Sequence, residues 1–505
     1  MSLSLTALLL VSVAVLGGAL ALAGFVWAIR HGHLDPTTDQ PALDSIEFRA
    51  RLDELASVPV LLYFASGVLW LLAGTLFGLV ASLKFDMPDW LGTIPPLAFG
   101  RLRPAHLNAV TYGWASLAGC GCLVWLTSRL CRAPIQRRSW LFGSVALWNL
   151  GVAYGILSIL FGASLGVEWL EFPLPAAAMI AVAFVLFAGS ILTTFFVRQV
   201  KSLYVSLWYI VASVVWFPLL YLVANLPIYS GTLHGVVNWW YAHNALAVWF
   251  TPLGLALAYY FIPKIIGRPI HSYYLSLLGF WSFALFYNWN GVHHLVGGPV
   301  PNWLQTISIV ASVMMVIPVL AVAVNHHMTA FRHLGAVRDS LALRFTVFGA
   351  MCYTAVSFQG SMESLRDVQE TVHFTHYTIG HAHLGVYGFL TMVLFGAMYY
   401  ITPRVARWEW TRPRWIEVHF WHTAAGVALY VIATCVGGWI QGMQMNDAAK
   451  PFVDVVAFMK PFLGLRSVSG ILMGAGHLIF AFLFVEIILR RGPGRPAVPM
   501  RGDAP

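Results

Sequence analysis

The chain has 505 residues, of which 59% are hydrophobic and only 10% are charged, and its mean hydropathy is +0.75. This composition excludes a soluble globular domain and is typical of a protein that crosses a membrane many times. The formal net charge of +9 is therefore expected to reflect membrane topology, and no segment is typical of a nucleic-acid or nucleotide site. The five cysteines form neither a C-x-x-C-H haem-attachment motif nor a zinc pattern.

Thirteen apolar runs are long enough to cross the hydrocarbon core of a membrane as helices. The first run lies in residues 1–30 and lacks a small-residue cleavage site, so it is predicted to be a retained anchor, followed by a polar linker over 31–55. The other twelve are predicted to form one all-α bundle over 56–490, and residues 491–505 form a short tail. In chain order the runs are 3–29, 58–84, 105–129, 139–163, 174–197, 205–225, 235–263, 272–295, 303–325, 341–360, 377–402, 418–440 and 466–489.

Basic residues alternate from one predicted loop to the next. One set of loops and the tail are rich in Lys and Arg, whereas the intervening loops are poor in them or carry acidic residues such as Glu168 and Glu171. Because loops rich in Lys and Arg stay in the cytoplasm, this pattern predicts a multi-pass protein with a cytoplasmic C-terminus. The basic set consists of Arg129, Arg132, Arg137, Arg138, Arg198, Lys201, Lys264, Arg268, Arg332, Arg338, Arg344, Arg404, Arg407, Arg412, Arg414, Arg490, Arg491, Arg495 and Arg501.

Two groups stand out among the eighteen histidines when this orientation is applied. Eight lie near cytoplasmic span ends or loops and are expected to be interfacial polar residues; these are His31, His33, His271, His326, His327, His333, His419 and His422. Six others come from four different spans and are all predicted to lie in the outer half of the bilayer; these are His106, His243, His293, His294, His381 and His383. Ionisable residues inside spans are functional candidates, and imidazole is a common metal ligand, so the second group predicts one metal-binding site.

The spacing of these histidines divides the site. His381 and His383 are two residues apart, which places them on nearly opposite sides of a helix, so they can serve two planar cofactors. His106 is a candidate for the second axial ligand of one of them. The other three, in "NWWYAHNALAVWF" (238–250) and "FYNWNGVHHL" (286–295), form a set suited to copper, zinc or iron. Tyr287 precedes His294 by seven residues, so both are expected on one face of the same helix.

At these residues the chain resembles the catalytic subunit of the cbb3-type (C-family) haem–copper oxidases. Besides the two stretches just quoted, the resemblance rests on "FGRLRPAHLNAVTYGW" (99–114), "YYFIPKIIGRPIHSYYLSLLGFW" (259–281), "HFTHYTIGHAHLG" (373–385) and "YYITPRV" (399–405). It implies a twelve-helix bundle in the bacterial inner membrane, with the active site toward the periplasm. The implied activity is the reduction of dioxygen to water, coupled to proton uptake and translocation. The implied partners are membrane-bound c-type cytochrome subunits, which would deliver the electrons.

The resemblance also implies roles for individual residues around two haems. His106 and His383 become the axial ligands of a low-spin haem b, and His381 becomes the proximal ligand of a high-spin haem b3. Arg103 and Arg466, the latter in "PFLGLRSVSG", resemble residues that pair with haem propionates.

Three further groups are carried over from the family. His243, His293 and His294 become the ligands of the copper ion CuB, and Tyr287 becomes the redox-active tyrosine beside it. Calcium is expected near "EWLEFP" (168–173), where Glu171 is the matching carboxylate. Tyr259 and Ser276 match a single proton pathway that leads toward Tyr287.

The chain departs from the usual cbb3 pattern at three positions. Gln359 in "SFQGSMES" (357–364) stands where a glutamate is usual, Gly279 where a histidine of the proton path is common, and His376 where an acidic residue is usual. These departures bear on proton delivery and leave open a divergent branch that uses another gas.

Two alternative functions remain open at this point. A nitric oxide reductase of the same superfamily would hold non-haem iron, which favours carboxylate ligands, yet the chain has no Asp or Glu between Glu171 and Asp339. A non-catalytic carrier of haem or metal would need neither a tyrosine beside the metal nor histidines on opposite helix faces. Separately, "GFVWAIRHGHLDP" (24–36) is similar to the small single-span maturation protein of these oxidases, so the first span is either a fused segment of that kind or an ordinary anchor.

Overall fold

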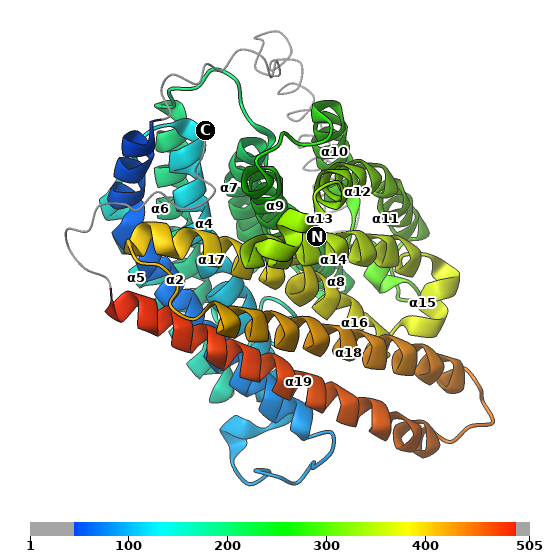
Figure 1. Cartoon of the computed structure of the whole chain (residues 1–505). Helices are drawn as coiled ribbons and strands as arrows, with labels where there is room; N and C mark the ends of the chain where they lie inside the picture. The colour runs from blue at the N-terminus through cyan, green and yellow to red at the C-terminus, as the bar shows by residue number, and fades with distance from the viewer. Residues whose placement is uncertain (1–44, 491–505) are drawn as a thin grey trace.

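The computed structural model describes residues 45–490, and within this range the chain folds into helices without any β-strand (Figure 1). The predicted anchor at 3–29 and the tail at 491–505 lie outside the described residues. The α-helices are α2 (Ile46–Leu83), α3 (Phe99–Asn108), α4 (Ser116–Cys131), α5 (Arg138–Leu160), α6 (Leu174–Phe196), α7 (Val205–Ala224), α8 (Gly231–Ala245), α9 (Thr251–Ile266), α10 (Tyr273–Phe286), α11 (Asn302–Met314), α12 (Val316–Phe331), α13 (Leu334–Asp339), α14 (Leu341–Glu363), α15 (Arg366–Val372), α16 (His376–His383), α17 (Met392–Ala406), α18 (Pro413–Met445) and α19 (Phe452–Leu489).

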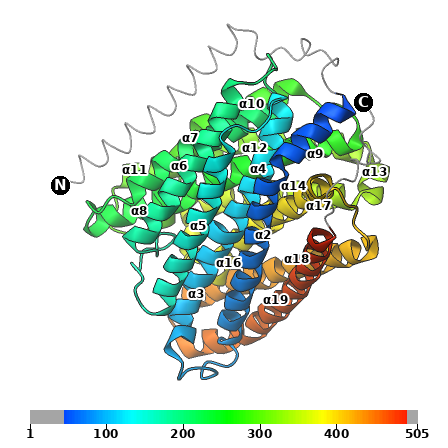
Figure 2. The same ribbon diagram turned by 90° about the vertical axis from the view of Figure 1, so that its left-hand side faces the viewer.

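Eleven helices of the described part are long and apolar enough to cross a membrane, and they match eleven of the twelve predicted spans of the bundle. Four of these spans join two α-helices into one rod, as α3 with α4 and α8 with α9. Their axes run roughly along one direction, and the long hairpin of α18 and α19 forms one side of the bundle (Figure 2). The all-helical membrane fold is therefore confirmed, while the count of twelve spans plus one stays a prediction.

The remaining predicted span, 272–295, is wrong as a continuous helix. Helix α10 ends at Phe286, and two short 3₁₀ turns follow, η5 (Tyr287–Trp289) and η6 (Val292–Leu295). Asn290 between them is extended, and Gly291 has a φ of 114°, which only glycine adopts without strain. The apolar composition of the run predicted its place in the bundle but not this break.

The first described helix also begins earlier than predicted. Helix α2 starts at Ile46, inside the segment predicted to be a linker, and the Ser45 side chain caps it by accepting a hydrogen bond from the Phe48 backbone N–H. The extra length places Asp53 next to α4. There Arg129 donates two hydrogen bonds to the Asp53 carboxylate, at 2.6 and 3.0 Å, and the Trp125 indole donates a third at 2.7 Å. A buried carboxylate with three donors is fully paired, so it ties α2 to α4.

Three π-helical segments interrupt the rods immediately after predicted ligands. They are η3 (Ala109–Ala115) after the helix that carries His106, η4 (Leu246–Phe250) after the helix that carries His243, and η7 (Leu384–Thr391) after His383. A π-helical turn widens the helix and rotates the residues on either side of it, and such turns are frequent at functional sites. The positions of these segments therefore mark the same region as the histidines do.

Candidate metal centre

His243, His293 and His294 come together in the folded chain. Their ligand nitrogens all lie within 4.8 Å of one another. The ring centroid of His243 is 4.8 Å from that of His293 and 5.6 Å from that of His294. Three neutral imidazoles at this separation could hold copper, zinc or iron.

The break in the chain after α10 is what brings the two neighbouring histidines to α8. A Cβ atom on Gly291 would lie 2.7 Å from the Trp239 carbonyl oxygen and 2.9 Å from the Trp240 Cα, so only glycine fits there. The Asn244 amide donates to the Asn290 carbonyl at 3.0 Å, and the Trp240 indole donates to the Asn288 carbonyl at 3.1 Å. The turn is thus bound directly to the helix that carries His243.

Two serines of α11 fix the orientation of His293. Ser308 Oγ lies 3.0 Å and Ser312 Oγ 3.1 Å from His293 Nδ1. Ser308 Oγ accepts the backbone N–H of His293, and Ser312 donates its own proton to the Ser308 carbonyl. Both hydroxyls contact Nδ1, so Nε2 is the ring nitrogen of His293 that remains for a metal. These two serines were missed in the sequence, although two hydroxyls four residues apart in an apolar helix were a usable signal.

Tyr287 lies beside the three histidines, but not for the reason predicted. Its ring centroid is 5.4 Å from that of His243 and 4.9 Å from that of Phe283. The expectation that Tyr287 and His294 share one helix face is wrong, because the helix ends before Tyr287 and the two residues belong to separate 3₁₀ turns. The tertiary fold nevertheless places the phenol next to the candidate metal ligands.

His106 and His383 face each other as a parallel pair. Their rings are 6.4 Å apart between centroids and inclined by only 9°. His106 Nδ1 hydrogen-bonds the Gly74 carbonyl at 2.7 Å, and His383 Nδ1 hydrogen-bonds the Ile379 carbonyl at 2.9 Å, so each Nε2 remains for a metal. A metal bound at about 2 Å from each Nε2 would place the two nitrogens about 4 Å apart. The ring centroids lie farther from the metal than the nitrogens do, so the observed centroid distance fits one iron with two axial histidines.

His381 projects from the other side of α16. It lies close enough to His243, His293 and His294 for electrostatic interaction with each of them. A Cβ atom on Gly360 would lie 3.1 Å from His381 Cε1, so glycine leaves the imidazole room. His381 thus faces the three-histidine cluster while His383, two residues later, faces His106.

Arg466 suits the charged edge of a haem. Its guanidinium lies over the Phe85 ring at 4.8 Å and near the Tyr430 ring at 5.9 Å. Its Nε and Nη1 are buried and have no hydrogen-bond partner in the described part of the chain, a state that costs free energy unless a carboxylate approaches. Arg103, the other predicted propionate partner, is instead paired with Glu168 and its side chain is half exposed.

Glu171 is a buried carboxylate in the loop between α5 and α6. The Asn108 side chain donates to its Oε2 at 2.9 Å. Burial raises the pKa of the Glu171 carboxyl, and the hydrogen bond from Asn108 opposes this rise only in part. A cation bound at this carboxylate would offset the cost of burying its charge. The predicted calcium site has this one matching carboxylate and stays a prediction.

Tyr259 and Ser276 are both buried and lie at the same part of α12. The Asn325 side chain donates to Ser276 Oγ at 2.8 Å, and the Tyr259 ring is 4.2 Å from the His326 ring between centroids. His326 was expected at the membrane interface, and so was His419, but both are buried, so that prediction is wrong for these two. Asn325 and His326 are the polar residues that sequence reasoning missed here.

The three departures from the cbb3 pattern have clear surroundings. The Gln359 amide donates to Cys435 Sγ at 3.4 Å, and His376 Nδ1 hydrogen-bonds the Gln441 side-chain oxygen at 3.0 Å. A Cβ atom on Gly279 would lie 3.1 Å from Val322, so α10 and α12 pack closely where the family often has a histidine.

Known proteins resemble the chain over most of its length. The profile of the family described as "Cytochrome C and Quinol oxidase polypeptide I" matches residues 58–472. The cbb3-type cytochrome c oxidase subunit CcoN1 of Stutzerimonas stutzeri is 30% identical over 432 residues, which cover 82% of this chain and 91% of the relative. The cytochrome c oxidase subunit 1 homolog of Agrobacterium tumefaciens (strain T37) is 30% identical over 463 residues, covering 87% of this chain and 84% of the relative.

More distant similarities extend to another enzyme and to a solved structure. A nitric oxide reductase subunit of Stutzerimonas stutzeri is 23% identical over 458 residues, covering 84% of this chain and 93% of that protein. A cryo-EM structure described as a heme-copper terminal oxidase dimer matches with a TM-score of 0.61 at 14% identity, covering 90% of this chain and 86% of that one, which shows a shared fold. Because the family profile spans most of the chain and relatives at 30% identity cover 82% and 87% of it, the chain belongs to the cytochrome c and quinol oxidase polypeptide I family.

Proposed function

We propose that this chain is the catalytic subunit of a cbb3-type terminal oxidase, which reduces dioxygen to water with electrons from c-type cytochrome. The observation that carries the proposal is the contact between Tyr287 and an all-imidazole cluster, His243, His293 and His294. The similarity to a cbb3-type subunit over 91% of that subunit's length supports it.

The residues present fit two haems and one further metal. When bound, a high-spin haem b3 on His381 and a copper ion on His243, His293 and His294 would supply the metal pair at which dioxygen is reduced, and a low-spin haem b between His106 and His383 would supply electrons. Arg466, with two buried and unpaired nitrogens, would bind haem propionates, and Arg103 would do so if its pair with Glu168 opens. Calcium is proposed at Glu171 as a further ion.

The protein side chains hold ligands and move protons. Ser308 and Ser312 hold the His293 ring through Nδ1; with a metal on Nε2, Nδ1 would carry the proton and could donate it to one of these hydroxyls. Tyr287 would donate a proton from its hydroxyl group, together with an electron, when the bond between the oxygen atoms breaks. Each dioxygen takes up four electrons and four protons and gives two molecules of water. We assign the resupply of protons to the polar residues around Tyr259 and Ser276, which include Asn325 and His326.

The proposed placement in the membrane follows from the basic loops. The C-terminus and the loops rich in arginine would face the cytoplasm of a bacterial inner membrane, and the metal site would lie toward the periplasm. The chain has no C-x-x-C-H motif, so electrons would arrive from membrane-bound partner subunits that carry c-type haem.

Nitric oxide reduction is the second candidate, because the reductase of Stutzerimonas stutzeri aligns with 84% of this chain. Two observations weigh against it. The cluster consists of imidazoles alone, and residues 172–338, which include both helices that bring these histidines, contain no Asp or Glu. A non-haem iron would favour at least one oxygen ligand in this place. A simple carrier of haem or metal would not need a phenol in contact with His243.

The decisive experiment is performed on the purified assembled complex. A reduced-minus-oxidised optical spectrum with metal analysis is expected to show two b-type haems and one copper for each copy of this chain. Oxygen uptake is expected to exceed nitric oxide uptake, and Tyr287→Phe is expected to reduce oxygen turnover about a hundredfold or more, as the loss of a proton donor does. Tyr154→Phe, at an exposed position of α5, is the matched control and leaves turnover unchanged.

Other outcomes lead to other functions. Non-haem iron in place of copper, with faster uptake of nitric oxide than of oxygen, would replace the oxidase with the reductase. A complex without haem would leave the non-catalytic carrier as the remaining candidate function. Unchanged oxygen turnover in Tyr287→Phe would remove Tyr287 from the mechanism.

A further inference from the structure

The histidines of the candidate centre differ in what their second ring nitrogen contacts. Nδ1 of His106 and of His383 hydrogen-bonds a backbone carbonyl, at 2.7 and 2.9 Å. Nδ1 of His381 is also buried, but it makes no hydrogen bond within the described chain. A metal-bound histidine almost always donates this second N–H, because the bond fixes the ring and strengthens it as a ligand. His381 Nδ1 therefore requires an acceptor from a neighbouring residue.

That residue is Glu363, the last residue of α14. Its side chain is only 3% exposed, and its Oε2 lies 3.6 Å from His381 Nδ1. Oε2 is buried and, like Nδ1, makes no hydrogen bond within residues 45–490. A carboxylate is costly to bury unless it is paired. A small movement of either side chain would bring these two unsatisfied groups within hydrogen-bond distance.

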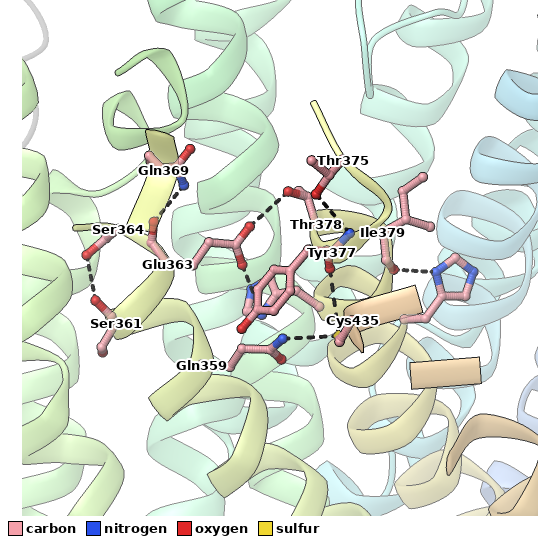
Figure 3. A network of polar contacts seen from close by, with 12 residues as sticks. Gln359, Ser361, Glu363, Ser364, Gln369, Thr375, Tyr377, Thr378, Ile379 and Cys435 are labelled. Carbon is pink, nitrogen blue, oxygen red and sulfur yellow. Dashed lines mark hydrogen bonds and ion pairs between the residues drawn. The ribbon is translucent and has the colours of Figure 1, made fainter. Parts of the chain in front are cut away.

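The other oxygen of Glu363 is held in place. Thr378, on α16 with His381, donates from Oγ1 to Glu363 Oε1 at 3.0 Å. The Glu363 backbone carbonyl accepts a hydrogen bond from the Gln369 amide at 2.6 Å. Figure 3 shows Glu363 reaching from the end of α14 toward Thr378, with Gln369 bonded behind it. The carboxylate is thus oriented by α16, the same helix that presents the histidine.

The same face of α14 carries Gln359 one turn earlier. Its amide donates to Cys435 Sγ, and Figure 3 shows it separate from the bond between Glu363 and Thr378. Gln359 is neutral, so it cannot supply negative charge to His381. Glu363 is the carboxyl group that faces His381.

We propose that Glu363 is the positioning residue of His381, accepting the Nδ1–H proton in a hydrogen bond and so strengthening the imidazole as a ligand of the high-spin haem. The inference rests on the proposed function, since it takes His381 as the iron ligand. It separates the two haem sites chemically: carbonyl oxygens hold the ligands of the low-spin haem, and a carboxylate holds the ligand of the other. A carboxylate partner gives the histidine more anionic character and favours the oxidised iron.

The test uses the purified assembled complex and two spectroscopic readouts. Glu363→Gln is expected to lower the iron–histidine stretching frequency in the resonance Raman spectrum of the reduced protein, because a neutral amide weakens the donation from His381. It is also expected to raise the reduction potential of the high-spin haem, while the potential of the low-spin haem stays unchanged as an internal reference. Adding Gln359→Glu to Glu363→Gln is expected to reverse part of both shifts if a carboxylate one turn earlier reaches the same ring.

Controls keep the test decisive. Ser364→Ala removes only a local bond to the Ser361 carbonyl, beside Glu363, and shifts neither readout. Thr378→Val keeps the carboxyl group of Glu363 but removes the hydrogen bond that orients it. It is expected to lower the stretching frequency by less than Glu363→Gln does. If Glu363→Gln does not assemble, Thr378→Val is the variant that tests the proposal. An unchanged stretching frequency in Glu363→Gln, or in Thr378→Val where Glu363→Gln does not assemble, overturns the proposal. A wild-type protein without a histidine-bound high-spin haem would instead refute the proposed function.

Discussion

Hydrogen bonds to the ring nitrogens decide which atom of each histidine is available to a metal. His293 is held by two serines, His106 and His383 by backbone carbonyls, and His381 faces Glu363. The serines and carbonyls contact Nδ1 of the first three histidines and leave Nε2 for a metal, and we propose the same role for Glu363 at His381. At the scale of single residues, the site is therefore defined by these partners as much as by the ligands.

Glu171 gives a prediction at this scale, concerning calcium and pH. Burial raises its folded-state pKa, so the folded chain holds the proton more firmly than the unfolded chain does. The ionised carboxylate therefore weakens the fold above that pKa, and the penalty disappears as the pH falls through it. In a calcium chelator at neutral pH, Glu171→Gln should unfold at the same temperature as the wild type or a few degrees higher, and the difference should shrink at acid pH.

Adding calcium to the same two proteins tests whether the ion binds at Glu171. If the ion binds at Glu171, calcium raises the thermal midpoint of the wild-type complex in detergent and leaves that of Glu171→Gln unchanged. Asp89→Asn, at an exposed carboxylate of the loop between α2 and α3, is the control and responds to calcium as the wild type does. An equal calcium response in Glu171→Gln and in the wild type would show that the ion does not bind at this carboxylate.

Interruptions of regular helix shape the centre at the scale of elements. The π-helical segments η3, η4 and η7 follow the ligand-bearing helices, and α10 ends before its histidines. A regular helix would have placed Tyr287 and His294 on one face, whereas the observed turn folds back onto α8. The turn is possible because Gly291 can adopt a φ of 114° and approach the Trp239 carbonyl.

Gly291→Ala tests whether this close approach positions the proposed copper ligands. The added methyl group would lie 2.7 Å from the Trp239 carbonyl oxygen, so the turn must move and His293 and His294 must move with it. We expect the copper-to-haem ratio, measured over a series of free copper concentrations, to reveal a roughly tenfold to hundredfold loss of affinity. The optical band of the low-spin haem should persist, because His106 and His383 lie on other helices.

Gly297→Ala is the matched control for that variant. Gly297 also has a positive φ, of 83°, but no atom of a neighbouring residue lies within 4 Å of the place where an added methyl group would sit, so only backbone strain is added. It should keep its copper. Equal copper content in the two variants would mean that contact with α8 does not set the position of the histidines.

Charge distribution sets the expected topology at the scale of the whole molecule. Arginines and lysines are concentrated in alternate loops, and α18 and α19 form the final hairpin of the described chain. Under the positive-inside rule, the turn at 446–451 and the C-terminus should lie on opposite sides of the membrane. This arrangement also decides from which side protons and electrons reach the metal site.

Reporter fusions test this topology directly. A green fluorescent protein, which fluoresces only in the cytoplasm, should be bright after residue 505 and dark when inserted at Lys450. Alkaline phosphatase, which is active only outside the cytoplasm, should give the reverse pattern at the same two sites, so each reporter controls the other. The opposite pattern for both reporters would invert the proposed orientation.

The sequence alone determined the class of fold and most of the candidate ligands. Long apolar runs leave no alternative to membrane-spanning helices, since backbone groups in lipid must be bonded internally. Histidines are rare and costly in such runs, so their positions were informative without any structure. The same reasoning failed for His326 and His419, because distance from a span end does not show whether neighbouring helices cover a residue.

Only the tertiary structure decided how those ligands meet. Helical periodicity describes one continuous element, so it could not predict the break after Phe286, the π-helical turns, or the contact of Gly291 with α8. Nor could it pair Ser308 with His293, or Glu363 with His381, because these partners come from different helices. A linear pattern records which face of a helix a residue occupies, whereas the geometry of a metal site depends on how several helices pack against one another.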